Sequence, residues 1–296
     1  MPSTTDDSAA SDTVSPPESI SVTERLSSNN YRTRKAQFDN MLTIFGRKPV
    51  LEVLEDPAIS VHCLHLASSN KSAGIIEKIL QRASQRNIPI RYHDKRALSR
   101  ISRNSKQDQG VAADLNLAHY QQLDQFLANY EPRASDRFIA LDQVTNPQNL
   151  GMIIRSIAAS NIQGLLLPNR GSATLGPLVI KASAGTLFKC PIIRCESLSS
   201  AMQQLKQRTI RSIALSGNID ESERQNARAS KPLSRFASDI SNAEQAEYPL
   251  LFLLGNETHG LSNEILEQAD ELAYIPMNNG VESLNVAVTA GIIAFL

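Results

Sequence analysis

Residues 275–296 read IPMNNGVESLNVAVTAGIIAFL and join a polar turn to a segment without charged side chains. Pro276 and Gly280 mark the turn, and Ser283 is the predicted N-cap of a helix that begins at Leu284. Because this helix is apolar on all sides, it is predicted to lie in a core or a subunit interface. With about eleven apolar residues it is too short for a membrane span, which needs roughly twenty.

The polar boundary between turn and helix, Ser283–Asn285, has two interpretations. A cap above a core helix is the simpler one. Polar side chains in a glycine-containing loop also commonly hold a ligand. The boundary alone favours the cap, so a ligand site here needs support from other parts of the sequence.

The composition limits the classes of protein that the sequence can encode. Its 296 residues are enough for two domains, and its 30 Lys and Arg against 30 Asp and Glu require any nucleic-acid site to be a local patch. Cys63, Cys190 and Cys195 lack C-x-x-C spacing, which is typical of reduced intracellular thiols. No secretory signal or transmembrane stretch is evident, so the cytoplasm is the expected location.

The first part of the chain is predicted to be a tail followed by a small domain. Residues 1–40 are rich in Ser, Thr, Asp, Asn and Pro, and their few apolar side chains cannot offset the entropy of ordering, so a disordered tail is expected. Residues 41–117 have the alternation of a small α/β domain. Its expected elements are a helix-like stretch over 42–54, a strand over 61–66, a helix over 75–83, a strand over 88–92 and a short strand over 109–113.

This domain contains a basic run: residues 82–106 include eight basic residues and one acidic residue, Asp94. They are Arg82, Arg86, Arg91, Lys95, Arg96, Arg100, Arg103 and Lys106. Such an excess of positive charge can neutralise phosphates. A solvated helix surface is the usual explanation of a charge run. This segment alone leaves both interpretations open.

From residue 136 the sequence has the pattern of a βαβ unit, and residues 118–135 before it are predicted to be a linker. The expected elements are a strand over 138–141, a helix over 152–159 and a strand over 165–167. The loop after the first strand reads DQVTNPQNLG. In an open α/β sheet such a loop lies at the carboxyl edge, where ligands bind. Arg155 is expected near this loop.

Two more apolar strands end in polar loops. The elements expected after residue 170 are strands over 191–194, 212–215, 248–254 and 272–275 and helices over 198–208 and 262–269. Residues 217–247 form a polar insertion without a predicted structure. The loops after residues 141, 254 and 275 thus each follow the end of a predicted strand. None matches a Walker phosphate loop or a dinucleotide fingerprint, and neither a G-x-S-x-G elbow nor an H-E-x-x-H motif occurs.

Taken together in this order, the three loops resemble the signature motifs of the SpoU or TrmH-type RNA ribose methyltransferases, a branch of the SPOUT superfamily. The motifs are Asp142–Arg155, Leu254–Leu261 and Ile275–Val286, and Lys181–Gly185 is similar to the Ser-Ala-Gly segment of the family. The resemblance covers residues 136–296. Less specifically, residues 41–117 resemble the ribosomal-protein-L30e-like substrate domain of many members.

The resemblance implies an α/β fold whose C-terminal domain has a parallel sheet and a deep trefoil knot, preceded by the L30e-like domain and the tail. It also implies S-adenosyl-L-methionine as cofactor, a homodimer, and methyl transfer to a ribose 2′-hydroxyl of RNA. rRNA is favoured as the substrate over tRNA. Neither a metal nor a membrane is implied.

The resemblance also assigns site residues by their places in the motifs. The catalytic group would comprise Asn149, Arg155, Glu257, Ser283 and Asn285. The cofactor would be held by the main chain at Gly255, Ile275 and Leu284, with Met277 lining its pocket. A guanidinium gives up its proton with difficulty, so Arg155 would either lose a proton transiently beside the phosphate or stabilise developing alkoxide charge.

A catalytically silent RNA-binding or ribosome-assembly protein on the same scaffold is the alternative, and base methylation is a third reading. Retention of all five catalytic-type residues favours the enzyme. Two departures from the family pattern stand out. Thr258 occupies a position where relatives often have glycine, and the final helix stops at Leu296, which puts the stability of the expected dimer in question.

Overall fold

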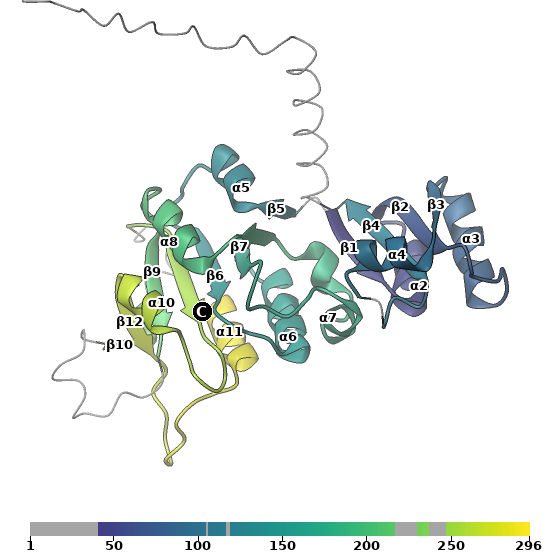
Figure 1. The fold of residues 1–296 in the computed structure, drawn as a ribbon. Helices are drawn as coiled ribbons and strands as arrows, with labels where there is room; N and C mark the ends of the chain where they lie inside the picture. The colour runs from purple at the N-terminus through teal and green to yellow at the C-terminus, as the bar shows by residue number, and fades with distance from the viewer. Residues whose placement is uncertain (1–40, 105, 117–118, 217–229, 237–246) are drawn as a thin grey trace, which may run out of the picture. The chain divides into compact units, whose positions relative to one another are not determined.

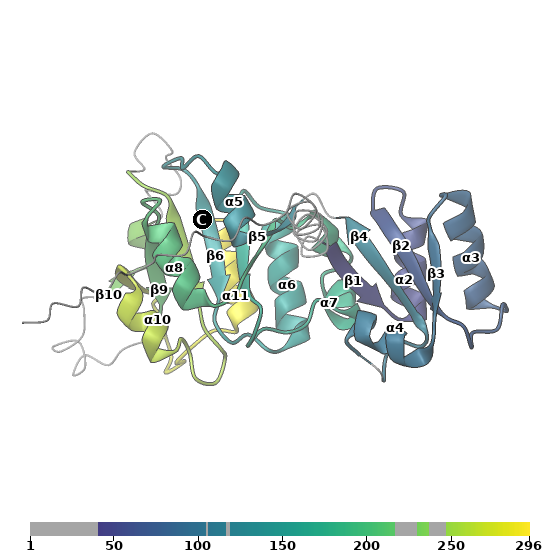
Figure 2. The same cartoon turned by 45° about the horizontal axis from the view of Figure 1, so that its top comes forward.

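The structure is a computed structural model that describes residues 41–104, 106–116, 119–216, 230–236 and 247–296. The predicted tail, residues 1–40, lies outside the described residues, as does most of the polar insertion. Figures 1 and 2 show two β-sheets, each with helices packed against it.

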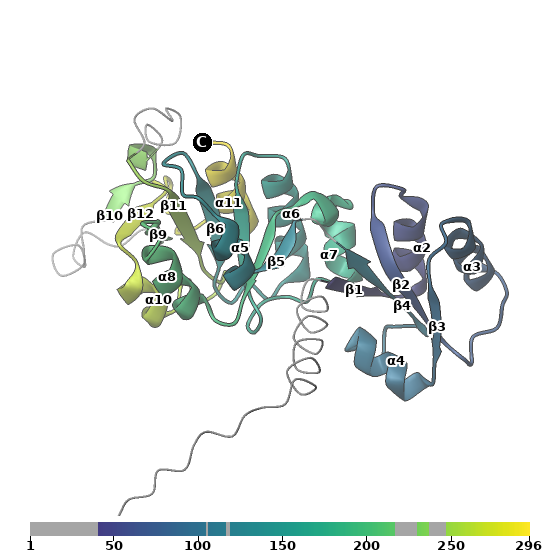
Figure 3. The ribbon, with the colours of Figure 1, turned by 90° about the horizontal axis from the view of Figure 1, so that it is seen from above.

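The first sheet has four strands in the order β1-β4-β2-β3. Its strands are β1 (Met41–Phe45), β2 (Ser60–Ala67), β3 (Ile90–His93) and β4 (Val111–Asn116), and its helices are α2 (Arg47–Glu55), α3 (Ile75–Gln85) and α4 (Lys95–Ser102). Strand β4 pairs antiparallel with β1 and β2, whereas β3 pairs parallel with β2. Figure 3 shows α2 and α3 on one side of this sheet and α4 on the other.

The helix-like stretch predicted over 42–54 is wrong in its first part, because residues 41–45 form strand β1. Leu42, Ile44 and Phe45 are all buried, so the apolar spacing of so short a segment fits either structure. Pairing with β4, from Met41 opposite Asn116 to Phe45 opposite Ala112, makes it a strand. Gly46 then adopts a φ of 95°, and α2 begins at the next residue.

The second sheet has eight parallel strands in the order β10-β12-β9-β11-β6-β7-β8-β5. Six of them follow the sequence prediction to within two residues: β6 (Arg137–Leu141), β7 (Gly164–Pro168), β8 (Ile192–Cys195), β9 (Arg211–Leu215), β11 (Leu250–Leu254) and β12 (Glu271–Tyr274). Their runs of apolar residues are typical of parallel strands that are buried on both faces.

The two edge strands were not predicted. Strand β5 (Tyr120–Gln122) and helix α5 (Leu123–Asn129) lie within the segment interpreted as a linker, and β5 pairs with β8. Strand β10 (Ser230–Pro232) lies in the polar insertion and pairs with β12. Both strands have only three residues, and neither shows the apolar alternation that would reveal a strand.

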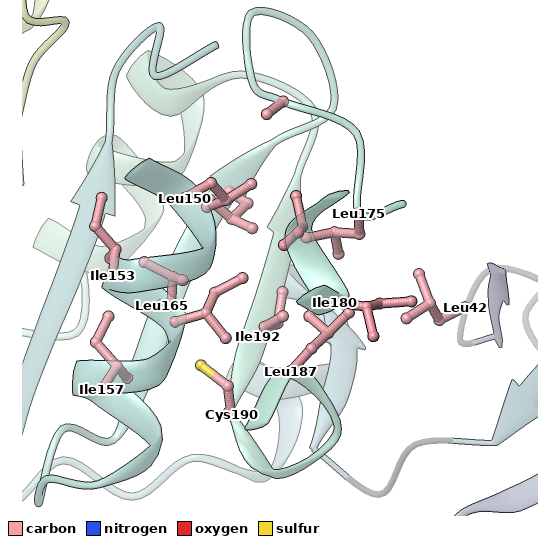
Figure 4. Close-up of a cluster of buried hydrophobic side chains, with 14 of the residues drawn as sticks. Leu42, Leu150, Ile153, Ile157, Leu165, Leu175, Ile180, Leu187, Cys190 and Ile192 are labelled. Atoms are coloured by element: carbon pink, nitrogen blue, oxygen red, sulfur yellow. The ribbon is translucent and has the colours of Figure 1, made fainter. Parts of the chain in front are cut away.

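Helices cover both faces of the second sheet. On one face lie α6 (Pro147–Ala158), α7 (Pro177–Ala182), the 3-10 helix η1 (Thr186–Lys189) and α11 (Val286–Ala294); on the other lie α5, α8 (Leu198–Lys206) and α10 (Asn263–Gln268). Side chains of β6 alternate between the two cores, with Phe138 on the α8 side and Ile139 on the α6 side. Figure 4 shows Ile153 and Ile157 of α6 near Leu165 and Ile192 of the sheet.

Helix α11 begins two residues later than predicted. Its N-cap is Asn285, whose side-chain Oδ1 accepts a hydrogen bond from Ala287 N at 2.8 Å, and not Ser283. The helix is also not buried on all sides. Val286, Ala287, Ala290 and Ile293 face the core, whereas 52% of Val288 is exposed.

The three cysteines are free and buried, in agreement with the prediction of reduced thiols. Burial raises the pKa of the Cys195 thiol to about 11. In the part of the chain that the structure describes, no helix has the length and apolarity needed to cross a membrane. The same residues contain no group of three or more His, Cys, Asp or Glu side chains placed to hold a metal ion.

Close packing of α6 against α7 depends on Gly151. A Cβ atom at this position would lie 2.4 Å from Ala182 Cβ and 2.9 Å from Ser183 N. By contrast, a Cβ atom on Gly291 in α11 would have Ser156 Oγ as its nearest neighbour, at 3.7 Å. Both glycines are helical, so an alanine gains the same helix propensity at each, and only the steric cost differs.

We therefore expect Gly151→Ala to lower the free energy of unfolding by about 1–3 kcal/mol, the usual cost of overpacking. Gly291→Ala is the matched control and should be neutral or stabilise by up to about 1 kcal/mol. Urea denaturation of the two variants measures both values. Equal stability of the two would show that α6 and α7 do not pack as described.

Candidate active site at the carboxyl edge of the parallel sheet

The three predicted motif loops leave the carboxyl ends of β6, β11 and β12, which lie along one edge of the parallel sheet. From β6 the chain continues through β7 and β8 on one side, while β11 and β9 lie on its other side. The boundary between β6 and β11 is therefore a topological switch point. In open α/β sheets this is the place where ligands bind.

Asn149 connects the first two loops. Asn146 caps α6 by accepting a hydrogen bond from Gln148 N at 2.8 Å, and Pro147 occupies the first helical position. This start places Asn149 in the first turn of α6, where its side chain is buried and its Nδ2 donates to Glu257 Oε1 in the second loop.

Asn285 connects the third loop to the same residue. Its Nδ2 donates to Asn149 Oδ1 at 3.1 Å, while its Oδ1 accepts from Ala287 N. One amide thus caps α11 and orients another amide, which in turn orients the Glu257 carboxylate. The structure brings together three of the predicted catalytic residues in a chain of hydrogen bonds that runs Asn285, Asn149, Glu257.

The second loop, Gly255–Leu261, is folded back on itself. Asn256 and Gly260 exchange two backbone hydrogen bonds of 2.9 Å, and Asn256 Oδ1 accepts from Thr258 N at 2.7 Å. A Cβ atom on Gly255 would lie 2.1 Å from the carbonyl carbon of Gly260, so only glycine fits this position. Thr258 lies at the exposed tip and does not alter the contact of Glu257 with Asn149.

Two residues of the first loop hold the second loop in place through hydrogen bonds. Asp142 is buried; its backbone N donates to Leu254 O and its Oδ2 accepts from Ser262 N, both at 2.8 Å. Gln143, at a φ of 55°, turns its carbonyl toward Asn256 Nδ2, which donates to it at 2.9 Å. Sequence reasoning quoted these residues within the motifs but gave them no role. Asp142 directly follows the apolar strand β6, and Asn256 follows Gly255 after the adjacent apolar strand β11; this pattern could have indicated that the two loops interact.

Two predicted catalytic residues stand apart from this chain of hydrogen bonds. Ser283 is exposed in the loop before α11, and Arg155 is exposed on α6. Within the described part of the molecule, neither side chain makes a hydrogen bond to Asn149, Glu257 or Asn285. Both side chains are exposed, so a ligand can reach them.

The predicted cofactor residues line the same edge. Ile275 and Met277 are partly exposed, and Leu284 is 36% exposed, although all three are apolar. Between residues 275 and 284 the described chain has one backbone–backbone hydrogen bond, from Val281 N to Asn278 O at 3.2 Å. Apolar side chains therefore lie in this loop beside backbone groups that make few hydrogen bonds to other backbone groups.

Comparison with known proteins identifies the family. The profile described as the SpoU rRNA Methylase family matches residues 136–295, and one described as RNA 2′-O ribose methyltransferase substrate binding matches residues 43–121. The chain belongs to the SpoU family of RNA methyltransferases. It is similar to two proteins described as uncharacterised tRNA/rRNA methyltransferases.

The first of these relatives, from Mycobacterium ulcerans, is 28% identical over 270 residues, which are 91% of this chain and 81% of the relative. The second, from Mycobacterium avium, is 29% identical over 251 residues, which are 85% of this chain and 75% of the relative. The alignments therefore include both domains.

Solved structures show the same fold. The SpoU methyltransferase AviRb from Streptomyces viridochromogenes, in complex with AdoMet, has a TM-score of 0.55 and 22% identity and covers 90% of this chain and 91% of its own. An AdoMet-bound rRNA methyltransferase from Sinorhizobium meliloti has a TM-score of 0.52 and 22% identity, with coverage of 94% and 95%. The parallel sheet is thus that of the SpoU methyltransferase structures.

The two functions of Asn285 can be separated by substitution. Asn285→Asp keeps the oxygen that caps α11 but loses the donor to Asn149, whereas Asn285→Ala loses both. We expect both variants to lower methyl transfer about tenfold, as for a hydrogen bond worth about 1.4 kcal/mol. Only the alanine variant should also lose about 1 kcal/mol of stability.

Methylation rates and urea denaturation measure these effects. Asn278→Asp, the same chemical change in the same loop, is the control and should leave both unchanged. Full activity of Asn285→Asp would show that its contact with Asn149 has no part in the reaction.

Proposed function

We propose that the protein transfers a methyl group from S-adenosyl-L-methionine to a ribose 2′-hydroxyl of RNA, with rRNA favoured over tRNA. The observation that carries this proposal is the hydrogen-bonded chain of Asn149, Glu257 and Asn285, which joins all three motif loops at the switch point of the sheet. The description of the substrate-binding profile, RNA 2′-O ribose methyltransferase, supports the ribose as acceptor.

S-adenosyl-L-methionine is the cofactor, as in the AviRb complex. The main chain at Gly255, Ile275 and Leu284 would hold it, and Met277 would line its pocket. When bound, it supplies a methyl group that is already activated by its positive sulfur. In the transfer, the carbon–sulfur bond would break as the carbon–oxygen bond forms, its electron pair would stay on sulfur, and the 2′-hydroxyl proton would pass to water.

The residues of the chain then have two tasks: to align the attacking oxygen and to accept the charge that develops on it. Arg155 is exposed on α6, and a guanidinium group suits the stabilisation of negative charge on the 2′-oxygen and the neighbouring phosphate. Glu257 uses one carboxylate oxygen to bind Asn149, which leaves the other to accept a hydroxyl or amine of a ligand. Ser283, exposed in the third loop before α11, would position the substrate.

The proposal predicts that Arg155→Ala reduces the rate of methylation by about a hundredfold or more, the usual cost of losing a group that stabilises transition-state charge. The assay uses labelled S-adenosyl-L-methionine with rRNA and, separately, tRNA. Ribose methylation is identified by its block of alkaline cleavage at the modified nucleotide. Arg133→Ala removes an exposed arginine before the amino end of β6 and should be fully active.

Each alternative gives a distinct result in this experiment. Full activity of Arg155→Ala would exclude the arginine from the reaction. Label that does not block alkaline cleavage would indicate base methylation. RNA binding without binding of S-adenosyl-L-methionine would identify a silent RNA-binding or ribosome-assembly protein.

We propose that α6 and α11 form the interface of a homodimer. Met152 is 42% exposed on α6, and Val288 and Phe295 are 52% and 64% exposed on or just after α11. The two helices pack together, with Ser156 of α6 next to Gly291 of α11. Apolar side chains gathered on two adjacent helices are typical of a surface covered by a partner.

Val288→Glu should therefore convert a dimer into a monomer, because it would bury an unpaired charge in the interface. Light scattering coupled to size-exclusion chromatography measures the mass directly. Leu178→Glu places a charge on a leucine of α7 that is 63% exposed, and this variant should remain dimeric. A monomeric parent protein would contradict the proposal, and so would a Val288→Glu dimer.

The deep trefoil knot of the C-terminal domain, the L30e-like character of the first domain and the cytoplasmic location are part of the same proposal. Two observations support the knot. Strand β11 lies between β9 and β6, and the final helix α11 returns to pack on α6, the first helix of the domain. Three buried free thiols are consistent with a reducing compartment.

A further inference from the structure

The second loop carries Glu257 on a short exposed tip. Asn256 and Gly260 pair through two backbone hydrogen bonds, so residues 257–259 form a turn of three residues between them. Gly260 closes this turn at a φ of 68°, a left-handed conformation that glycine adopts without strain. Among the described residues, neither the N–H nor the carbonyl of Glu257 bonds to another backbone group. The backbone of Glu257 is therefore held through its neighbours.

Asn256 provides this hold from inside the turn. Its Oδ1 accepts hydrogen bonds from Thr258 N at 2.7 Å and from His259 N at 3.3 Å. One side-chain oxygen thus binds the two residues that follow Glu257, an arrangement that asparagine commonly forms in turns. Because the backbone of Asn256 is also paired with Gly260, the tip is fixed from its first residue.

The same side chain ties the tip to the first loop. Asn256 Nδ2 donates to the carbonyl oxygen of Gln143 at 2.9 Å. Gln143 lies directly after Asp142 and adopts a φ of 55°, which most residues other than glycine, asparagine and aspartate seldom do. Asp142 in turn bonds to Leu254 and Ser262, on either side of the second loop. These two residues of the first loop therefore hold the second loop at both ends and at the base of its tip.

The carboxylate of Glu257 needs this second hold. Its partner Asn149 is buried and has its own amide oriented by Asn285. A hydrogen bond from a fixed amide places one carboxylate oxygen, but that contact alone leaves the exposed backbone of Glu257 able to shift around it. Asn256 removes this freedom at the backbone. The direction of the second carboxylate oxygen, which does not bind Asn149, is then determined.

We infer that Asn256 is a positioning residue for methyl transfer, and that it acts by holding the backbone of Glu257 so that the carboxylate faces both Asn149 and the ligand. The inference rests on the proposed function for the part that Glu257 plays in the reaction. It goes further because it gives a role to a residue of the second motif that is not among the predicted catalytic or cofactor residues.

A double-mutant cycle tests whether Asn256 acts through Glu257. The measured quantity is kcat/KM for labelled S-adenosyl-L-methionine at saturating RNA. Asn256→Ala removes three side-chain hydrogen bonds and should lower this value about tenfold. Glu257→Ala removes the carboxylate itself and should lower it at least as far. The double variant should then match Glu257→Ala to within about twofold, whereas independent effects would multiply.

Asn104 offers a matched control in the first domain. Its Oδ1 accepts from Lys106 N at 3.3 Å and from Gln107 N at 3.0 Å, and its Nδ2 donates to Gln107 Oε1 at 3.3 Å. Asn104→Ala therefore loses the same number of hydrogen bonds from the same kind of turn. It should keep the kcat/KM of the parent. Urea denaturation of both alanine variants shows whether a loss of activity comes from loss of the fold.

Hydrogen exchange tests the geometry of the tip independently of the reaction. The backbone N–H groups of Thr258 and His259 should exchange roughly tenfold faster in Asn256→Ala, because both lose their acceptor. Asn256→Asp keeps an oxygen at the same place and should keep the exchange rates of the parent. Exchange resolved to single amides by NMR measures these rates.

The outcomes separate this inference from the proposed function. If the parent methylates RNA but the two single losses multiply in the double variant, or if Asn256→Ala is as active as the parent, Asn256 is not a positioning residue and the function stands. If the parent methylates neither rRNA nor tRNA, the proposed function fails, and exchange decides the inference. Unchanged exchange at Thr258 and His259 in Asn256→Ala would overturn it, and faster exchange would support it.

Discussion

The structure depends on one constraint: three loops far apart in sequence must meet at the same edge of a parallel sheet. Parallel strands provide this, because all their carboxyl ends lie on one side. The chain of hydrogen bonds then fixes the loops to each other. Asn149 bonds to Glu257, 108 residues later, and to Asn285, 136 residues later. A buried amide with both its donor and its acceptor used cannot shift without leaving a polar group unpaired, which costs about 1–3 kcal/mol.

Backbone clearance is the second requirement for this arrangement. At Gly255 the chain passes so close to Gly260 that a side chain is excluded, and the loop that carries Glu257 folds back directly after the strand. At Gly151 the contact of α6 with α7 sets the position of the helix that carries Asn149. Glycines outside the hydrogen-bonded chain thus determine where its members lie. The positions of Asn149, Glu257 and Asn285 therefore depend on backbone packing as much as on the hydrogen bonds between these side chains.

The sequence predicted the elements that have a clear apolar pattern. It did not predict the strands that form only because they pair with a neighbouring strand. Six strands of the second sheet were predicted because buried strands are continuous apolar runs. The three site residues that meet were assigned by the resemblance of the loops after these strands to the family motifs. Strands β5 and β10 are polar and only three residues long, so only their neighbours make them strands. The cap of α11 was assigned to Ser283 because serine is a good N-cap, but Asn285 is an equally good one and also reaches Asn149.

The charges show how a chain with no net charge can still have a basic surface. Three cations of the second domain are paired with acids: Lys206 lies 2.7 Å from Asp270, and Arg211 and Lys231 lie 3.2 and 2.6 Å from Glu271. The opposite charges in these ion pairs cancel each other. The lysine and arginine side chains of the pairs are exposed, so the pairs add little to stability. On α4 the cations form no salt bridge in the described chain. A protein with no net charge can therefore contain a positively charged first domain. A phosphate chain interacts with the charges within a Debye length of about 10 Å and not with the net charge of the whole protein.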